Sequence, residues 1–214
     1  SVDHPAIKDS RYANVRCKDA IVDRFSKKFG RRPDSGHERK GVVVHLFWQE
    51  EECRIFFDTS GEPLSKRGYR KIPLRAPMQE TLAAAVIIST GWRGEGNFIN
   101  PMCGSGTLAI EAAWMALNIP AGFLRTNYGF MHLRGYDESS WKGSLQRAKT
   151  HIKRSFPHKI IATDMSPEAV QAAKLNAAAA GVGNLIEFEV CDYAETPIPD
   201  GGGVVILNPE YGER

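Results

Sequence analysis

The stretch Asn100-Pro-Met-Cys-Gly-Ser-Gly-Thr107 decides the fold of this chain. It joins a short apolar run, Asn97–Asn100, to a segment from Thr107 to about Leu117 that reads as a helix. Gly104 and Gly106 allow a sharp turn and let a ligand approach the backbone without a Cβ in the way. The helix that follows offers unpaired N–H groups and a partial positive charge. A strand, a glycine loop and a helix in this order predict a ligand-binding turn of an α/β sheet.

The loop lacks the features of a phosphate site. A Walker motif would need a lysine that is absent here, and a full GxGxxG motif would need glycine where Ala109 stands. A small zwitterion, such as the methionine end of S-adenosylmethionine, suits a loop with fewer backbone donors. The alternative is a tight strand-to-helix turn that binds no ligand.

The segments around this loop alternate between strand and helix patterns. An insertion of about 20 residues, rich in glycine and aromatic side chains, follows the helix after the loop. Strands separated by helices predict a parallel, doubly wound α/β sheet. We expect further helices at 81–89, 141–155 and 167–180, and further strands at 160–163, 185–190 and 204–207.

The front of the chain has a different pattern. Residues 11–29 place apolar side chains on one helical face, and Gly30 is expected to end that helix. Two β-branched and aromatic runs, 41–48 and 53–58, predict an antiparallel hairpin. Residues 59–75 are rich in glycine, proline and basic side chains and read as a connector between domains.

The two sides of the boundary between residues 75 and 76 differ in charge. Residues 1–75 hold 17 Lys and Arg against 11 Asp and Glu, whereas residues 76–214 hold 11 against 14. A basic front suggests contact with a polyanion. A random imbalance on a solvated surface would give the same counts, so charge alone leaves both readings open.

The composition argues against membrane and metal proteins. No apolar run reaches the roughly 18 residues needed to span a bilayer, and no signal-peptide pattern opens the sequence. The four cysteines form no CxxC pair, which argues against a zinc site or a disulfide framework. We therefore expect no metal, no membrane contact and a location in the reducing cytoplasm.

Two acids stand at the ends of predicted strands. Asp164 ends the strand after the glycine loop, where a carboxylate can accept hydrogen bonds from both ribose hydroxyls. Asp192 ends the next strand and is placed to receive an adenine amino group. Each acid alone is more often a cap or turn residue, but ligands of such sheets bind at these strand ends. Together they predict a nucleoside ligand.

The last predicted strand runs into Asn208-Pro-Glu-Tyr-Gly212. Methyl transfer to an exocyclic amine needs the nitrogen held in line and its protons accepted as charge develops. The Asn208 side-chain oxygen and the Pro209 carbonyl are suitable acceptors, and Tyr211 offers a face on which an extruded base can stack. In isolation this five-residue segment would be an ordinary turn.

In combination, these segments resemble the amino-methyltransferases that carry an Asn-Pro-Pro-Tyr motif. One branch, the THUMP-containing 23S rRNA guanine-N2-methyltransferases, resembles nearly the whole chain. The resemblance is carried by four strings: Asp58-Thr-Ser-Gly-Glu62, Lys66-Arg-Gly-Tyr-Arg70, Ala76-Pro-Met-Gln-Glu-Thr81 and Asn100–Ala113.

This resemblance implies a Rossmann-like class I methyltransferase domain, S-adenosylmethionine as cofactor and 23S ribosomal RNA as substrate. Residues 1–75 would be the later part of an α+β THUMP region, which grips RNA, and its linker. Residues 76–214 would be the N-terminal part of the catalytic domain, whose doubly wound sheet is incomplete here.

The resemblance also implies roles for single residues. Target-base contacts fall on Asn208, Pro209 and Tyr211. Glu111 either braces the loop or lies on the surface of its helix. Cofactor contacts fall on seven positions: Asn100, Pro101, Cys103, Gly104, Gly106, Asp164 and Asp192.

Three features depart from the family pattern. Asn100 stands where the family usually has Asp, which removes a charge near the cofactor's amino group. Glu210 replaces the second Pro of the motif, and it either hydrogen-bonds the ring N–H of guanine or impairs the site. The sequence ends at Arg214, before about three further strands of a seven-stranded sheet, so we expect a fragment or the ordered portion of a longer protein.

Two other functions stay open. A DNA adenine-N6 methyltransferase shares the Asn-Pro-x-Tyr chemistry, and methyl incorporation into rRNA against duplex DNA would separate the two. A non-catalytic RNA-binding module that retains cofactor affinity would bind S-adenosylhomocysteine without turnover.

The role of Glu210 is directly testable. Replacing it with the family's proline stiffens the loop and removes a negative charge beside the base. We expect Glu210→Pro to change turnover, lowering it if Glu210 binds the base and raising it if Glu210 impairs the site. An unchanged rate would dismiss both ideas.

Overall fold

The computed structural model describes residues 2–4, 7, 9–36, 38–74 and 77–209. Its contacts divide the chain into two compact units, which are described separately below. Unit 1 comprises Ser1–Pro63 and Asn127–Glu138, and unit 2 comprises Leu64–Thr126 and Ser139–Arg214. The expected boundary between residues 75 and 76 falls on residues outside the described part, so that domain assignment stays a prediction.

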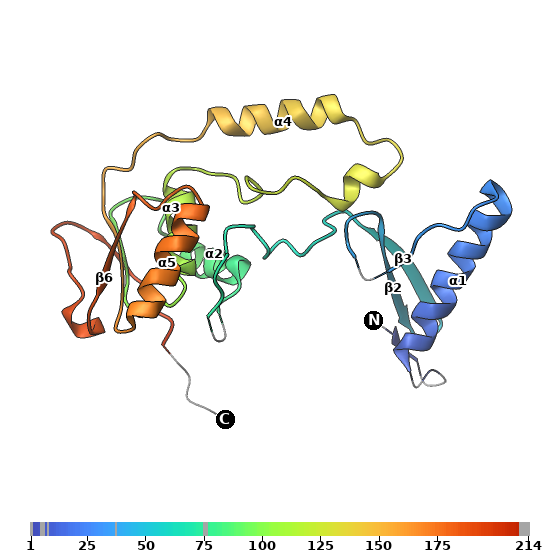
Figure 1. The fold of residues 1–214 in the computed structure, drawn as a ribbon, viewed down its shortest axis with the longest axis horizontal. Helices are drawn as coiled ribbons and strands as arrows, with labels where there is room; N and C mark the ends of the chain where they lie inside the picture. The colour runs from blue at the N-terminus through green and yellow to red at the C-terminus, as the bar shows by residue number, and fades with distance from the viewer. Residues whose placement is uncertain (1, 5–6, 8, 37, 75–76, 210–214) are drawn as a thin grey trace. The chain divides into compact units, whose positions relative to one another are not determined.

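Unit 1 is a helix on a small sheet. Helix α1 (Ser10–Phe29) lies against the strands β1 (Val2–Asp3), β2 (Val43–Gln49) and β3 (Glu52–Asp58), which follow the order β1-β2-β3 (Figure 1). β2 and β3 form the expected antiparallel hairpin, while β1 pairs parallel to β2 and was not predicted. Two paired residues at the edge of a sheet are too few to give a sequence pattern.

The ends of α1 follow from local chemistry. The Asp9 carboxylate accepts a hydrogen bond from the Arg11 amide at 2.9 Å and caps the first turn. Gly30 ends the helix with φ of 67°, and its amide donates to the Ser26 carbonyl. The helix therefore ends at the predicted residue and begins one residue earlier than predicted.

Part of the long insertion belongs to unit 1. The short 3-10 turn η1 (Gly129–His132) packs against the end of β3, and the Phe130 amide donates to the Thr59 carbonyl at 3.0 Å. A Cβ at Gly129 would collide with the carbonyl oxygen of Asp58, so only glycine allows this close approach. The sequence pattern gave no sign of this return of the chain.

Unit 2 contains the predicted parallel sheet. Its strands are β4 (Asn97–Asn100), β5 (Ile160–Asp164), β6 (Ile186–Val190) and β7 (Gly203–Val205), in the spatial order β6-β5-β4-β7. All three pairings are parallel. The chain adds strands outward on one side of β4 and then places β7 on its other side. This order has a switch point between β4 and β7, which is where open α/β sheets bind ligands.

Apolar helices build the core of unit 2. Helix α3 (Thr107–Ala116) packs on β4 and β5, α5 (Pro167–Ala179) packs on β5 and β6, and α2 (Glu80–Ser89) packs on α3 (Figure 1). Nearly all of α3 is buried, because its small and apolar side chains face the sheet, α2 and the connector. The largest fully buried side chains are those of Trp114, Tyr69 and Phe98.

One helix differs from its prediction. The expected helix at 141–155 is α4 (Glu138–Thr150), which begins three residues earlier and ends five residues earlier. Glu138 favours the N-terminus of a helix through its negative charge. Beyond Thr150 the Lys153 amide donates to the carbonyl of Leu117 at 2.8 Å. This amide is therefore not used for a further helical turn.

The part of the connector that belongs to unit 2 is held against helix α3 by buried polar groups. The Arg67 guanidinium lies 3.3 Å from the Glu111 carboxylate, and the Tyr69 hydroxyl donates to the same carboxylate at 2.9 Å. Burial raises the pKa of Glu111, and the charge of Arg67 opposes that rise. Glu111 is buried, so its expected surface role is wrong. Its hydrogen bonds go to Arg67 and Tyr69 of the connector, and a direct brace on the glycine loop stays a prediction.

No described helix has both the length and the apolar composition needed to cross a membrane.

The Arg67–Glu111 pair yields a stability prediction. Glu111→Ala leaves a buried guanidinium without its carboxylate and the Tyr69 hydroxyl without its acceptor, so we expect a loss of about 3–5 kcal/mol in the free energy of unfolding. Glu187→Ala is the control, because it breaks an exposed ion pair with Lys159 and should cost no more than about 1 kcal/mol. Equal losses in urea unfolding would show that the buried pair does not hold the connector.

Candidate functional site

The glycine loop between β4 and α3 has the backbone that the sequence predicts. Gly104 and Gly106 have φ of 53° and 83°, in the left-handed region that favours glycine. A Cβ at Gly106 would stand 2.9 Å from the Cβ of Ala173 on α5, so this glycine also permits close packing of two helices. At Gly104, by contrast, no described atom lies within 4 Å of the Cβ position. The outer side of the loop is therefore open to a ligand.

Asp164, at the end of β5, holds this loop in place. One carboxylate oxygen accepts from the Gly104 amide at 2.9 Å, and the other accepts from the Ser166 amide at 3.0 Å. A carboxylate has about four acceptor positions, so two stay available for hydroxyl donors of a ligand. The side chain is half-buried at the carboxyl edge of the sheet. A ribose-binding role for Asp164 stays a prediction, and the loop contact is an additional role.

Cys103 is a buried residue of the loop. Its amide donates to the Thr163 carbonyl at 2.8 Å, which fixes the loop to the end of β5. Burial raises the pKa of the Cys103 thiol to about 12, and the nearby charge of Asp164 adds to the effect. The thiol is therefore protonated at neutral pH, which argues against a thiolate role for Cys103.

Asn100 and Pro101 stand where β4 ends and the loop begins. Both are buried, and Asn100 has no exposed surface. The Asn100 side-chain amide donates to the Ile206 carbonyl at 2.9 Å and to the Pro101 carbonyl at 3.2 Å. Direct contact of either residue with a cofactor stays a prediction.

The remaining predicted residues follow β6 and β7. Asp192 is exposed, and one of its carboxylate oxygens accepts from the Ala194 amide at 2.9 Å to begin the short turn η2 (Tyr193–Glu195). Asn208 and Pro209 are half-buried and follow β7 on the other side of the switch point. Tyr211 and Glu210 lie outside the described residues.

The structure brings these groups to one edge of the sheet. The glycine loop follows β4, Asp164 ends β5, Asp192 follows β6, and Asn208 follows β7. Because all four strands are parallel, their carboxyl ends meet at the same edge. The strand and register assignments thus support a common site without depending on any single side-chain contact.

Sequence reasoning missed a supporting residue on α5. Asn176 is buried, and its amide nitrogen donates to the Ser105 carbonyl of the glycine loop at 3.1 Å. Its side-chain oxygen accepts from the Lys71 and Ile72 amides of the connector at 2.8 and 3.0 Å. An asparagine in an alanine-rich helix gives no sign of its partners in the sequence, because they lie about 70 and 105 residues away.

Arg70 gives the loop a second support from the connector. Its guanidinium donates to the Thr107 hydroxyl at 3.0 Å, at the first residue of α3, and lies 3.4 Å from the Glu80 carboxylate. The basic connector was expected only as a domain boundary. Its string Lys66-Arg-Gly-Tyr-Arg70 carried the resemblance to the family, which was the one sequence signal for this role.

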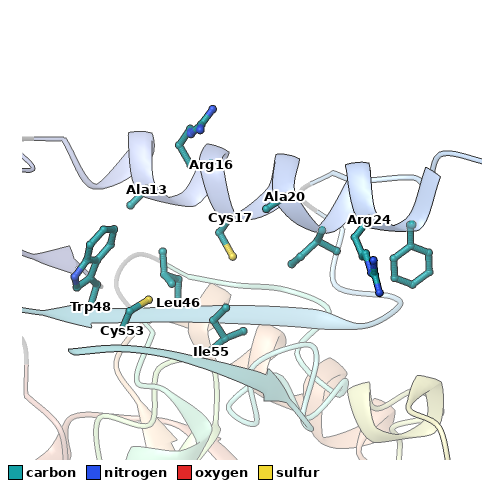
Figure 2. A pocket seen from close by; sticks show the side chains of 11 residues that line it. Ala13, Arg16, Cys17, Ala20, Arg24, Leu46, Trp48, Cys53 and Ile55 are labelled. Carbon is teal, nitrogen blue, oxygen red and sulfur yellow. The ribbon is translucent and has the colours of Figure 1, made fainter. Parts of the chain in front are cut away.

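A separate groove lies in unit 1. It has a volume of about 670 Å³ and runs between α1 and the hairpin of β2 and β3. Figure 2 shows Cys17 pointing from the helix toward the strands, while Arg16 points away from them. The floor is formed by Leu46, Trp48 and Ile55, so the groove is mainly apolar. It contains none of the predicted site residues.

The strand order, the glycine loop and the acids at the carboxyl edge define a Rossmann-like class I methyltransferase fold. The methyltransferase family described as UPF0020, RMKL-like, matches residues 67–214, and the chain belongs to this family. A ribosomal RNA large subunit methyltransferase K/L from Psychromonas ingrahamii is 40% identical over an alignment of 213 residues, which covers 97% of this chain and 28% of that protein.

Solved structures agree with this assignment. SMU.472, solved in complex with SAH, is 28% identical with a TM-score of 0.83. A predicted N6-adenine-specific DNA methylase from Listeria monocytogenes is 33% identical with a TM-score of 0.84. Each match covers 100% of this chain and 58% of the solved chain. The chain therefore spans only part of the length of these relatives.

The raised pKa of Cys103 yields a prediction about reactivity. At pH 8 its thiol stays protonated and buried, so we expect iodoacetamide to modify it far more slowly than the exposed Cys53 in the folded protein. Peptide mass spectrometry over a time course would measure both rates, and unfolding in urea should make them similar. Equal rates in the folded protein would contradict the protonated, buried state of Cys103.

Proposed function

We propose that this chain carries the cofactor site and target loop of an S-adenosylmethionine-dependent methyltransferase acting on the exocyclic amine of guanine in 23S ribosomal RNA. One observation carries the proposal: the glycine loop and the Asn208-Pro209 segment flank the switch point between β4 and β7. Donor and acceptor of a transferred group need such neighbouring positions.

The cofactor side is supported by the shape and chemistry of the loop. The open side of Gly104 leaves room for the methionine end of the cofactor next to the N-terminus of α3. Asp164 has acceptor capacity for ribose hydroxyls, and Asp192 is exposed at the end of the next strand for the adenine amino group. S-adenosylmethionine supplies an activated methyl group on its sulfonium.

The target side is supported by the acceptors after β7. The Asn208 side-chain oxygen and the Pro209 carbonyl would accept hydrogen bonds from the amine, which orients its nitrogen toward the methyl carbon. During methyl transfer these two acceptors would stabilise the positive charge that develops on the amine nitrogen. The surplus proton of the methylated amine would then pass to water. Tyr211, outside the described residues, would stack on the extruded base.

Unit 1 would supply contacts to RNA in the manner of a THUMP region. Helix α1 and the turn after it carry a series of exposed basic side chains, and phosphate contacts of this kind give affinity without sequence specificity. The ribosomal RNA large subunit relative supports this substrate and, with it, a cytoplasmic location. The exposed basic residues of this segment are Arg11, Arg16, Lys18, Arg24, Lys27, Lys28, Arg31 and Arg32.

A second candidate is methylation of adenine N6 in DNA. It is supported by the Listeria monocytogenes structure, described as a predicted N6-adenine-specific DNA methylase. The Asn-Pro segment suits either amine, because both are exocyclic nitrogens whose lone pairs are delocalised into a ring. The ribosomal RNA methyltransferase relative makes guanine in RNA the stronger proposal, since that match covers 97% of this chain at 40% identity.

A methyl-transfer assay separates these functions. We expect labelled methyl groups to enter unmodified large-subunit rRNA, with N2-methylguanine in the digest, and not to enter duplex DNA. Asn208→Ala should lower turnover by about 100-fold because an acceptor aimed at the reacting amine is lost. Asn184→Ala, in an exposed turn before β6, is the control and should keep full turnover.

Other outcomes would contradict the proposal. Label in duplex DNA alone would favour the adenine methyltransferase. Binding of S-adenosylhomocysteine without label in either nucleic acid would favour a non-catalytic binding module.

A further inference from the structure

Asn100 occupies a special place in unit 2. It is the last residue of β4, it has no exposed surface, and its strand is one of the two that border the switch point. A buried polar side chain in this position needs partners, because burying an unpaired amide is costly. Its partners therefore indicate what the residue does.

The orientation of the Asn100 amide follows from those partners. Its nitrogen lies 2.9 Å from the Ile206 carbonyl oxygen and 3.2 Å from the Pro101 carbonyl oxygen. Carbonyl oxygens only accept hydrogen bonds, so the NH₂ group must face them and the side-chain oxygen must face away. That oxygen is buried and has no hydrogen-bond partner among the described residues.

The bond to Ile206 continues the pairing of β4 and β7 past the end of the strands. Along the backbone, Val205 pairs with Ile99, and the Ile206 amide donates to the Ile99 carbonyl at 2.9 Å. The next hydrogen bond in this series comes from the side chain of Asn100, whose NH₂ group donates to the Ile206 carbonyl. Two residues later the chain reaches Asn208.

We propose that Asn100 is a positioning residue that ties the cofactor loop, which is the glycine loop after β4, to the target loop that begins at Asn208, across the switch point. One NH₂ group holds Pro101, where the cofactor loop begins, and Ile206, just before the target loop. This inference rests on the proposed function of the two loops. It assigns Asn100 a task that depends on an amide donor and does not require contact with the cofactor.

The family usually has aspartate at position 100, but in this chain an aspartate there would meet the Ile206 and Pro101 carbonyls and change the chemistry of the link. A carboxylate has no donor and would face two carbonyl oxygens in a buried place, so the link would be broken and repulsive. A protonated carboxyl group has one O–H and could restore one of the two bonds. Burial favours the protonated form, so the link in Asn100→Asp would strengthen as the pH falls.

The same strand offers a matched control. Asn97, at the amino end of β4, is also buried, and its amide nitrogen donates to the Asp200 carbonyl at 3.1 Å. Its side-chain oxygen accepts from the Lys159 amide at 2.9 Å. Asn97→Asp therefore removes a buried amide donor from the same strand, at the edge of the sheet away from both loops.

The test compares methyl transfer by the wild-type chain, Asn100→Asp and Asn97→Asp from pH 6 to pH 9. At pH 9 we expect Asn100→Asp to reduce kcat by about 10-fold to 100-fold, with a smaller change in KM for S-adenosylmethionine. The ratio of variant to wild-type kcat should rise as the pH falls. Asn97→Asp should lose stability but show a kcat ratio near one at every pH.

Two further measurements keep the test independent of turnover and of folding. Amide hydrogen exchange should be faster at residues 102–109 and 206–208 in Asn100→Asp, and unchanged there in Asn97→Asp. Asn100→Ser keeps a neutral donor that is too short to reach both carbonyls, so its kcat should fall without any pH dependence.

The outcomes separate two failures. A wild-type chain without methyl transfer would count against the proposed function, while the exchange comparison would still decide the role of Asn100. Exchange in Asn100→Asp equal to that in Asn97→Asp at both loops, or a kcat ratio that does not change with pH, would overturn the positioning role.

Discussion

The hydrogen bond from the Gly104 amide to the Asp164 carboxylate is the interaction on which the site depends. The same carboxylate accepts from the Ser166 amide at the start of α5, so one side chain joins the glycine loop, the end of β5 and the next helix. Parallel strands bring their carboxyl ends to one edge, but they do not set the shape of the loops there. The Asp164 carboxylate sets the shape of this loop, and the close contact of Gly106 with Ala173 makes that shape compatible with helix packing.

A second set of contacts joins the connector to the same loop. Asn176 bonds the Ser105 carbonyl and two connector amides, and Arg70 bonds Thr107 at the start of α3. Arg67 and Tyr69 add the buried carboxylate of Glu111 one turn further along that helix. The segment that follows unit 1 thus supports the glycine loop, and a displacement of this segment would change the conformation of that loop.

Much of unit 2 was predictable because its signals are local. Glycines with positive φ, a strand before them and a helix after them mark the loop around Gly104, and the order of strands and helices gives the parallel sheet. The partners of Glu111 and Asn176 could not be predicted, because side chains distant in sequence make those contacts and several arrangements would satisfy the same pattern. The return of 127–138 to unit 1 was hidden for the same reason. At Asn100 the sequence showed a departure from the family, and only the structure showed two carbonyl partners for its amide.

Calorimetry with S-adenosylhomocysteine tests the central claim that the edge of the sheet around Gly104 and Asp164 is a nucleoside cofactor site. The wild-type chain should bind one molecule of S-adenosylhomocysteine. Asp164→Asn, which keeps the shape but has a single acceptor oxygen for two backbone amides and the ribose, should weaken that binding by at least about tenfold while the chain stays folded. Absence of binding by the wild type, or equal affinity of the folded Asp164→Asn variant, would contradict the assignment of this site.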